Sequence, residues 1–276
     1  MRRTWFITGA SRGIGEELVN SVLHAGDNVV ATARDPKKIK SLGLADRLLS
    51  VELDVTDNSQ INRAVKAAVN HFGSIDVLVN NAGYGHLGVF EEITSEEIHA
   101  EFNTNVFGLM NLTRAILPYM REQRSGRIFN ISSIAGLKGN FGGSAYNSSK
   151  FAVEGFSQSI AEELAPFGVY VTCISPGFFR TDFLDISSFK SSNRSISDYD
   201  EVMNKYLDFI NNRNHNQLGD PKKLAKVLIY LSSIENPPVS FLAGSDAIEW
   251  AMNANYYTQS EIEKWNDLSC STDGAW

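Results

Sequence analysis

The segment TWFITGASRGIG, residues 4–15, decides how this 276-residue chain folds. Residues 4–8 form a short apolar and β-branched run, which is typical of a buried strand. Glycines follow in the spacing G-x-x-x-G-x-G, and apolar residues then recur at helical spacing. A strand, a glycine-rich turn and a helix in this order place backbone amides where they can hold a pyrophosphate. The residues expected at this turn are Gly9, Ser11, Arg12, Gly13, Ile14 and Gly15.

The glycine spacing differs from the more familiar G-x-G-x-x-G, and three glycines can also form an ordinary turn. The rest of the chain favours the nucleotide-binding interpretation, because strand and helix patterns alternate as far as about residue 234. The expected strands are 4–8, 28–33, 48–53, 77–80, 126–131, 169–175 and 239–242, and the expected helices are 14–24, 59–72, 95–123, 145–165 and 221–231.

The strands are apolar without alternation, which suits a sheet covered on both faces. We therefore expect an α/β fold, in which residues 1–276 form a single Rossmann-like domain. Its core would be a doubly wound, seven-stranded parallel sheet with helices on both faces.

Two segments depart from this alternation. Residues 178–220 are rich in Ser, Asn, Asp and aromatic residues, with one helical pattern at about 199–211, and we expect them to form a substrate loop that covers the site. Residues 245–276 are expected to form a helical C-terminal extension with two helical pieces, 246–257 and 260–268.

The overall composition excludes several classes of protein. A formal charge of -7 and an isoelectric point near 5.3 leave no large positive field for nucleic acid. Two distant cysteines, Cys173 and Cys270, indicate neither a disulfide framework nor a metal site. No stretch approaches the roughly 20 apolar residues needed to cross a membrane. We expect a soluble, cytoplasmic protein.

The end of the second expected strand bears on cofactor choice. An NAD-binding protein places a carboxylate there to hold the ribose hydroxyls, but this chain has Ala33. Arg34 and Arg12 supply two guanidinium groups that would clamp a 2′-phosphate. NADP(H) is therefore favoured over NAD(H). The alternatives are that both arginines are ordinary surface charges, or that the neighbouring Asp35 contacts the ribose.

Four polar residues are candidates for the chemistry. Tyr146 and Lys150 lie four residues apart on an expected helix, so both project from one face. Ser133 follows the strand at 126–131, and Asn105 lies in the expected helix at 95–123. Each residue has an ordinary structural explanation by itself. Together, downstream of a cofactor turn, they indicate a catalytic set.

Carbonyl reduction needs a hydride on carbon and a proton on oxygen, which explains this choice of residue types. Tyr146 would donate the proton, and the Lys150 ammonium would lower the pKa of the phenol. Ser133 would hydrogen-bond the substrate oxygen. Serine hydrolysis fits less well, because Ser133 is not in a G-x-S-x-G elbow and no histidine or acid is evidently placed to activate it.

Over roughly residues 4–245 the chain resembles a classical short-chain dehydrogenase/reductase. The matching residues follow the family's order and spacing: the turn at 8–15, Asp54-Val55, Asn80-Asn81-Ala82-Gly83, Asn105, Ser133, the segment Tyr146 to Lys150, Pro176-Gly177 and Thr181. The tail, with Asn236-Pro237-Pro238, the segment 241–247 and the final segment 268–273, is similar to the branch related to 17β-hydroxysteroid dehydrogenases and carbonyl reductases.

This resemblance implies further roles. Asp54 and Val55 would contact the adenine, while Asn81, Ala82 and Gly83 would line the cofactor cleft. Lys150, beside Tyr146, would also hold the nicotinamide ribose, and Asn105 would support a water leading to Lys150. Pro176, Gly177 and Thr181 would position the nicotinamide. Family members commonly dimerise or tetramerise through two helices equivalent to 95–123 and 145–165, so a homo-oligomer is expected.

The substrate is expected to be a small carbonyl compound or its alcohol. Aromatic residues in segments that would border the pocket favour an apolar or aryl ketone, although they would equally suit packing within the loop; they are Tyr84, Phe141, Phe178, Phe179, Phe183, Phe189, Tyr199, Tyr206 and Phe209. Two alternative functions remain at this point: a nucleotide-binding sensor without turnover, and an epimerase or dehydratase that retains its NAD(P).

Overall fold

The expected parallel sheet forms the centre of the molecule in a computed structural model that describes residues 2–40, 46–185, 189–191, 196–214 and 216–274. Its seven strands lie in the order β3-β2-β1-β4-β6-β7-β9, and every pair is parallel. The strands are β1 Thr4–Ile7, β2 Asn28–Ala33, β3 Leu48–Glu52, β4 Val77–Asn80, β6 Gly126–Ile131, β7 Val169–Pro176 and β9 Ser240–Ala243. This confirms the α/β, Rossmann-like prediction.

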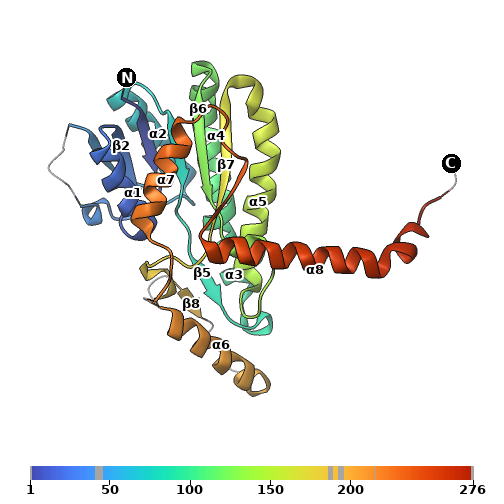
Figure 1. Ribbon diagram of the computed structural model, residues 1–276. Helices are drawn as coiled ribbons and strands as arrows, with labels where there is room; N and C mark the ends of the chain where they lie inside the picture. The colour runs from blue at the N-terminus through green and yellow to red at the C-terminus, as the bar shows by residue number, and fades with distance from the viewer. Residues whose placement is uncertain (1, 41–45, 186–188, 192–195, 215, 275–276) are drawn as a thin grey trace.

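Helices cover both faces of the sheet (Figure 1). In β1 the completely buried side chains alternate: Trp5 and Ile7 belong to one apolar cluster, and Phe6 to the other. The first cluster includes residues of α1 Gly13–His24 and α7 Pro221–Ser233. The second includes residues of α2 Asn58–Phe72, α4 Leu109–Gln123 and α5 Ser144–Leu164. Burying each such side chain stabilises the fold by about 1.5–3 kcal/mol.

The helix expected at 95–123 is interrupted. It begins as α3 Ser95–Phe102, where Thr94 and Glu97 form a capping box. It then widens into a π-helical segment, Asn103–Gly108, before α4. Single π turns of this kind occur often at functional sites, and this one carries Asn105.

Several shorter elements were not expected from the sequence. A second sheet pairs β5 Gly85–Leu87 with β8 Phe189–Ser191 in parallel. Short 3-10 helices lie at Pro36–Lys38, Phe90–Glu92, Ile134–Gly136, Ala165–Phe167, Asp182–Leu184 and Ser197–Tyr199. By contrast, the helix that was expected near 199–211 is present as α6 Asp200–Arg213.

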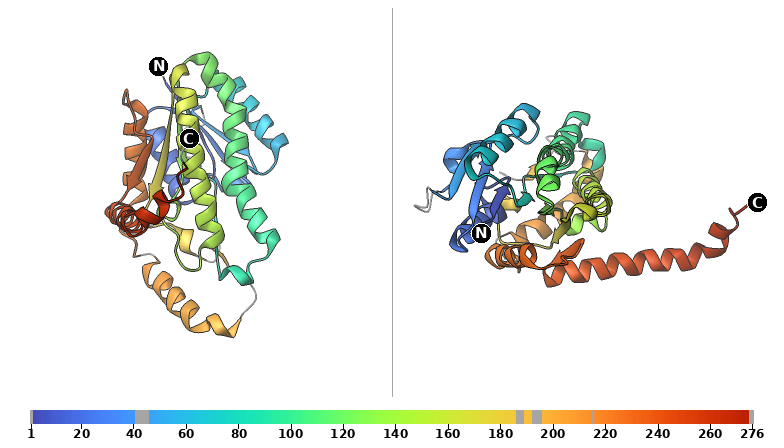
Figure 2. Two further views of the ribbon diagram at one scale, coloured as in Figure 1. Left: turned by 90° about the vertical axis from the view of Figure 1, so that its right-hand side faces the viewer. Right: turned by 90° about the horizontal axis from the view of Figure 1, so that it is seen from above.

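The C-terminal extension is one helix, α8 Ser245–Cys270, so the division into two pieces was wrong. Its first half packs on the body through Ala247 and Ala254, while every residue from Ile262 to Gly274 is exposed. Figure 2 shows this outer half projecting well beyond the sheet and its covering helices. Within the described residues, no helix combines the length and apolar character needed to span a bilayer.

Candidate active site

A cavity of about 880 Å³ opens where the parallel strands end. Residues that follow β1, β2, β3, β4, β6 and β7 contribute to its wall, which is the usual position of a ligand crevice in a doubly wound sheet. The predicted residues in the wall are Gly9, Ser11, Arg12, Gly13, Ile14, Arg34, Asp54, Val55, Asn81, Ala82, Gly83, Ser133, Tyr146, Lys150, Pro176, Gly177 and Thr181. Gly15 and Asn105 are not among the wall residues.

The glycine turn depends on the absence of side chains. Gly9 and Gly13 have φ values of +63° and +57°, which few other residues adopt. A Cβ on Gly15 would overlap the carbonyl oxygen of Gly9 and would lie 2.7 Å from Nδ2 of Asn81. Helix α1 therefore begins in close contact with the turn that precedes it, in a form that suits a pyrophosphate.

Two side chains fasten this turn to the end of β4. The Thr8 hydroxyl accepts hydrogen bonds from the backbone N–H groups of Asn81 and Ala82, each at 2.9 Å. The Asn81 amide donates to the carbonyl oxygens of Thr8 and Gly9, at 2.9 and 3.2 Å. Asn81 thus supports the cofactor turn from behind. Thr8 performs the same task, although the sequence analysis did not single it out.

The two arginines expected near the cofactor lie in the glycine turn and at the end of β2. Ala33 is buried, and both Arg34 and Arg12 are exposed residues of the cavity wall. The Asp35 carboxylate instead accepts a hydrogen bond from the Lys37 backbone at 3.1 Å and caps the following 3-10 helix. Asp35 is not part of the described cavity wall, so its position does not favour the alternative ribose contact.

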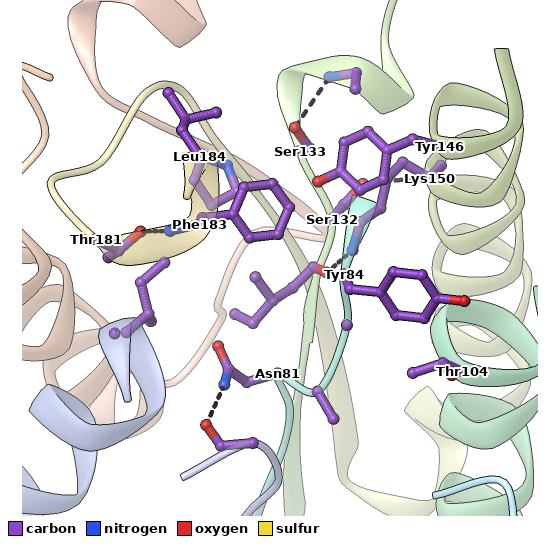
Figure 3. Close-up of a pocket in the computed structure, with 18 of the residues that line it drawn as sticks. Asn81, Tyr84, Thr104, Ser132, Ser133, Tyr146, Lys150, Thr181, Phe183 and Leu184 are labelled. Carbon is purple, nitrogen blue, oxygen red and sulfur yellow. Dashed lines mark hydrogen bonds between the residues drawn. The ribbon is translucent and has the colours of Figure 1, made fainter. Parts of the chain in front are cut away.

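The catalytic candidates meet on the opposite wall (Figure 3). The Tyr146 ring lies 5.6 Å from Nζ of Lys150, one turn further along α5. Lys150 is buried, and its ammonium donates to the carbonyl oxygen of Ile131 at 2.9 Å. Ser133 accepts a hydrogen bond from the Ala135 backbone at 3.2 Å, which fixes the hydroxyl beside the phenol. The structure thus brings together the three residues expected at the reacting centre.

Burial governs the protonation of this group. It raises the pKa of Tyr146, although a hydrogen bond from Ser133 acts in the opposite direction. It also lowers the pKa of Lys150 to about 8. Lys150 was expected to lower the pKa of the phenol, but in the protein alone burial raises this pKa and the opposing effect comes from Ser133. The phenol is therefore protonated at neutral pH and is suited to act as an acid.

Asn105 lies behind the wall and organises it. Its amide oxygen accepts from the Tyr84 backbone at 3.1 Å, and its amide nitrogen donates to the Tyr84 carbonyl oxygen at 2.8 Å and to the Ser149 hydroxyl at 3.1 Å. A Cβ on Gly83 would lie 3.0 Å from Oδ1 of Asn105 and 3.7 Å from Nζ of Lys150. Asn105 therefore joins the segment after β4 to helix α5 at the position of Lys150.

The loop after β7 is held by a residue that the sequence analysis missed. Asp246, in the first turn of α8, accepts a hydrogen bond from the Phe178 backbone at 2.7 Å and leaves no room for a Cβ on Gly177. Thr181 lies near Gly13, where a Cβ would be 3.5 Å from the threonine side chain. The loop after β7 therefore lies beside the glycine turn. Trp250 of α8 also lines the cavity, and neither Asp246 nor Trp250 belongs to a sequence motif that would identify it.

Comparisons with known proteins agree with this geometry. The sequence profile described as short chain dehydrogenase matches residues 3–190. "Oxidoreductase BOA17" of Botryotinia fuckeliana is 38% identical over 275 residues, covering 99% of this chain and 100% of the relative. A short-chain dehydrogenase from Streptomyces avermitilis has a similar solved structure, with a TM-score of 0.91 and 35% identity over 99% of this chain and 100% of that one.

A more distant structure has a bound cofactor. The 3-ketoacyl-(acyl-carrier-protein) reductase from Brucella melitensis, complexed with NADH, has a TM-score of 0.74 and 26% identity over 87% of this chain and 95% of that one. The present chain belongs to the short-chain dehydrogenase family. It is therefore an oxidoreductase that acts on CH–OH groups with a nicotinamide cofactor.

The close approach at Gly15 predicts the effect of a single methyl group. Gly15→Ala should force the cofactor turn apart and weaken NADPH binding at least about tenfold, as measured by fluorescence titration. Gly155→Ala is the matched control, because a Cβ there meets nothing within 4 Å. It should leave affinity unchanged and stabilise α5 by about 1 kcal/mol. Equal affinities in both variants would contradict the proposed fit at the turn.

Proposed function

We propose that the protein is an NADP(H)-dependent carbonyl reductase and alcohol dehydrogenase, which interconverts a ketone and a secondary alcohol. The observation that carries this proposal is the position of the Tyr146 phenol, beside Ser133 and Lys150 in a cavity at the carboxyl ends of the strands. The glycine turn and the basic end of β2 are the features that fit a phosphorylated dinucleotide.

When bound, the cofactor supplies or accepts a hydride. The chain's own residues manage the oxygen of the substrate. Tyr146 holds the proton that this oxygen needs, and Ser133 hydrogen-bonds the same oxygen as negative charge develops on it. The Lys150 ammonium, fixed by the Ile131 carbonyl, stabilises the phenolate that remains after the proton has been transferred.

Removal of the Tyr146 hydroxyl tests this mechanism directly. With NADPH and a panel of ketones, the wild-type protein should consume cofactor, seen as loss of absorbance. Tyr146→Phe should lower kcat about 100-fold to 10,000-fold, the usual effect of losing a general acid, while NADPH affinity persists. The exposed Tyr230 on α7 gives a control, and Tyr230→Phe should react normally. Cofactor binding without turnover in the wild type would instead support a nucleotide-binding sensor.

Arg34 is the residue most directly tied to the preference for NADP(H). Arg34→Asp should shift the ratio of kcat/KM values towards NADH by about tenfold to a hundredfold, because charge-assisted hydrogen bonds of about 1.5–3 kcal/mol are lost. Arg63→Asp, at an exposed position on α2, should leave the ratio unchanged. An unaltered preference in the Arg34 variant would mean that this guanidinium does not contact the 2′-phosphate.

The substrate end of the cavity supports an apolar or aryl ketone. The Phe183 ring lies 5.8 Å from the ring of Tyr146, beside the reacting centre. From α6, Phe209 packs against Phe178 and Tyr206, with ring centroids 6.4 Å apart in both pairs. Seven of the nine aromatic residues named from the sequence line the cavity: Tyr84, Phe141, Phe178, Phe179, Phe183, Tyr206 and Phe209.

The other two aromatics do not contribute to this interpretation. The Tyr199 hydroxyl donates to Glu91 at 3.1 Å, away from the cavity, and the Phe189 side chain lies outside the described structure. The described parts of 178–220 still supply most of the aromatic wall. We therefore retain that segment as the substrate loop of a single domain.

Truncation of one aromatic tests the substrate class. Phe209→Ala should raise KM for bulky aryl ketones about tenfold and change KM for small ketones little, because apolar contact with the larger substrates is lost. Phe90→Ala provides the comparison, since Phe90 is 67% exposed and is not part of this cavity. If both variants treat all ketones alike, the aromatic wall only packs the loop.

The remaining parts of the proposal concern branch, assembly and location. The tail supports a place near the branch of 17β-hydroxysteroid dehydrogenases and carbonyl reductases. Exposed Phe107 and Phe151, on the two helices expected at an interface, support a homodimer or homotetramer. Cys173 and Cys270 are both free, which suits a reducing cytoplasm.

A further inference from the structure

One buried carboxyl group near the reacting centre has no part in the mechanism so far. Glu101, on α3, has no exposed surface. Its Oε1 accepts a hydrogen bond from the His86 backbone at 3.2 Å, whereas its Oε2 meets no donor in the described chain. An ionised carboxylate with a bare, dry oxygen is strongly unfavourable. Burial accordingly raises the pKa of Glu101 to about 8, so the group is neutral at physiological pH.

Glu101 and Asn105 act on the same stretch of backbone. They lie four residues apart across the start of the π-helical segment. Glu101 accepts a hydrogen bond from the N–H of His86, and Asn105 accepts one from the N–H of Tyr84. Residues two apart in an extended segment present their N–H groups to the same side. The two side chains therefore hold one edge of this segment, which also passes beside the Lys150 ammonium at Gly83.

The titratable groups around Glu101 come from four elements and from the residue before β5. They are Glu97 on α3, His86 on β5, Tyr146 and Lys150 on α5, Lys190 on β8, and Tyr84, whose pKa Glu101 also raises. A negative charge on Glu101 raises the pKa values of both Tyr146 and Lys150. Burial lowers the pKa of His86, so this imidazole is neutral in the alkaline range. Ionisation of Glu101 therefore favours the protonated forms of both Tyr146 and Lys150.

We propose that Glu101 is a positioning residue that holds protons on Tyr146 and Lys150 when the surroundings become alkaline. Carbonyl reduction needs the phenol protonated and the ammonium charged, so a carboxylate that forms behind them extends reduction to higher pH. This proposal rests on the proposed function, because it assigns Tyr146 the role of acid. At neutral pH the same group is an uncharged hydrogen-bond acceptor for His86.

Glu101→Gln separates charge from structure, because its amide oxygen still accepts from the His86 backbone. The pH profiles of kcat/KM for ketone reduction by the variant and the wild type should coincide at pH 6–7. Above pH 8 the variant should lose activity earlier, with the alkaline limb about one pH unit lower, which is the order of shift that a buried unit charge produces at an effective dielectric near 20. Glu96→Gln, at an exposed position on the same helix, should follow the wild type.

Two results would overturn the proposal: profiles that coincide at every pH, or a loss in Glu101→Gln that is the same at every pH. Thermal unfolding gives an independent readout. The pKa of Glu101 is near 8 in the folded protein, above its value in the unfolded chain, so the folded state holds this proton more tightly. The stability that this proton contributes to the wild type is complete only at low pH and is lost as the pH rises towards 8.

The unfolding temperature of Glu101→Gln should therefore rise relative to that of the wild type between pH 5 and 8, and the difference should then level off. A constant difference would show that Glu101 does not titrate as stated. This measurement requires no substrate. A protein that shows the thermal signature but reduces no ketone would contradict the proposed function and not the titration of Glu101.

Discussion

A parallel sheet that is buried on both faces leaves its carboxyl edge as the place where polar chemistry can be assembled. The side chains of β1 illustrate the constraint, because Trp5, Phe6 and Ile7 are all completely buried. Apolar side chains on such strands fill the two apolar clusters, and buried polar exceptions such as Asn80 and Asn130 hydrogen-bond one another. Thr8, Asn81 and Ser133 all stand just beyond strand ends, and Asn81 and Ser133 line the cavity.

Helix α5 gives this edge its chemical character. It packs against the sheet, so Lys150 is buried, burial lowers the pKa of its ammonium to about 8, and this group donates to the Ile131 carbonyl. The phenol of Tyr146 is desolvated by the same packing. The electrostatic properties of the site thus follow from how closely α5 lies on β6 and β7, and not only from the two side chains.

Sequence patterns predicted the sheet and its strand boundaries to within one or two residues, and nearly all of the site residues they named lie in the cavity wall. These predictions agree with the structure because strand burial and the glycine turn are each encoded by a short, continuous stretch of sequence. The π-helical segment at Asn105 is not local: Asn105 is held by the backbone of Tyr84 and the side chain of Ser149, and no periodicity in 95–123 records those contacts. The β5–β8 pairing joins segments about a hundred residues apart and fails for the same reason.

Asp246, which is partly buried, and Glu101, which is buried, show why such polar residues are the hardest to predict. In the sequence each is one carboxylate on a helical pattern, and solvent exposure is the ordinary expectation for both. Only the fold shows that Asp246 accepts the Phe178 amide next to the cofactor loop and that Glu101 faces the His86 amide. A carboxylate that accepts a buried amide is stabilised by it, and one with a bare oxygen is driven to keep its proton. Burial raises the pKa of Glu101 to about 8, and one of its oxygens meets no donor in the described chain, whereas both carboxylate oxygens of Asp246 accept a backbone N–H.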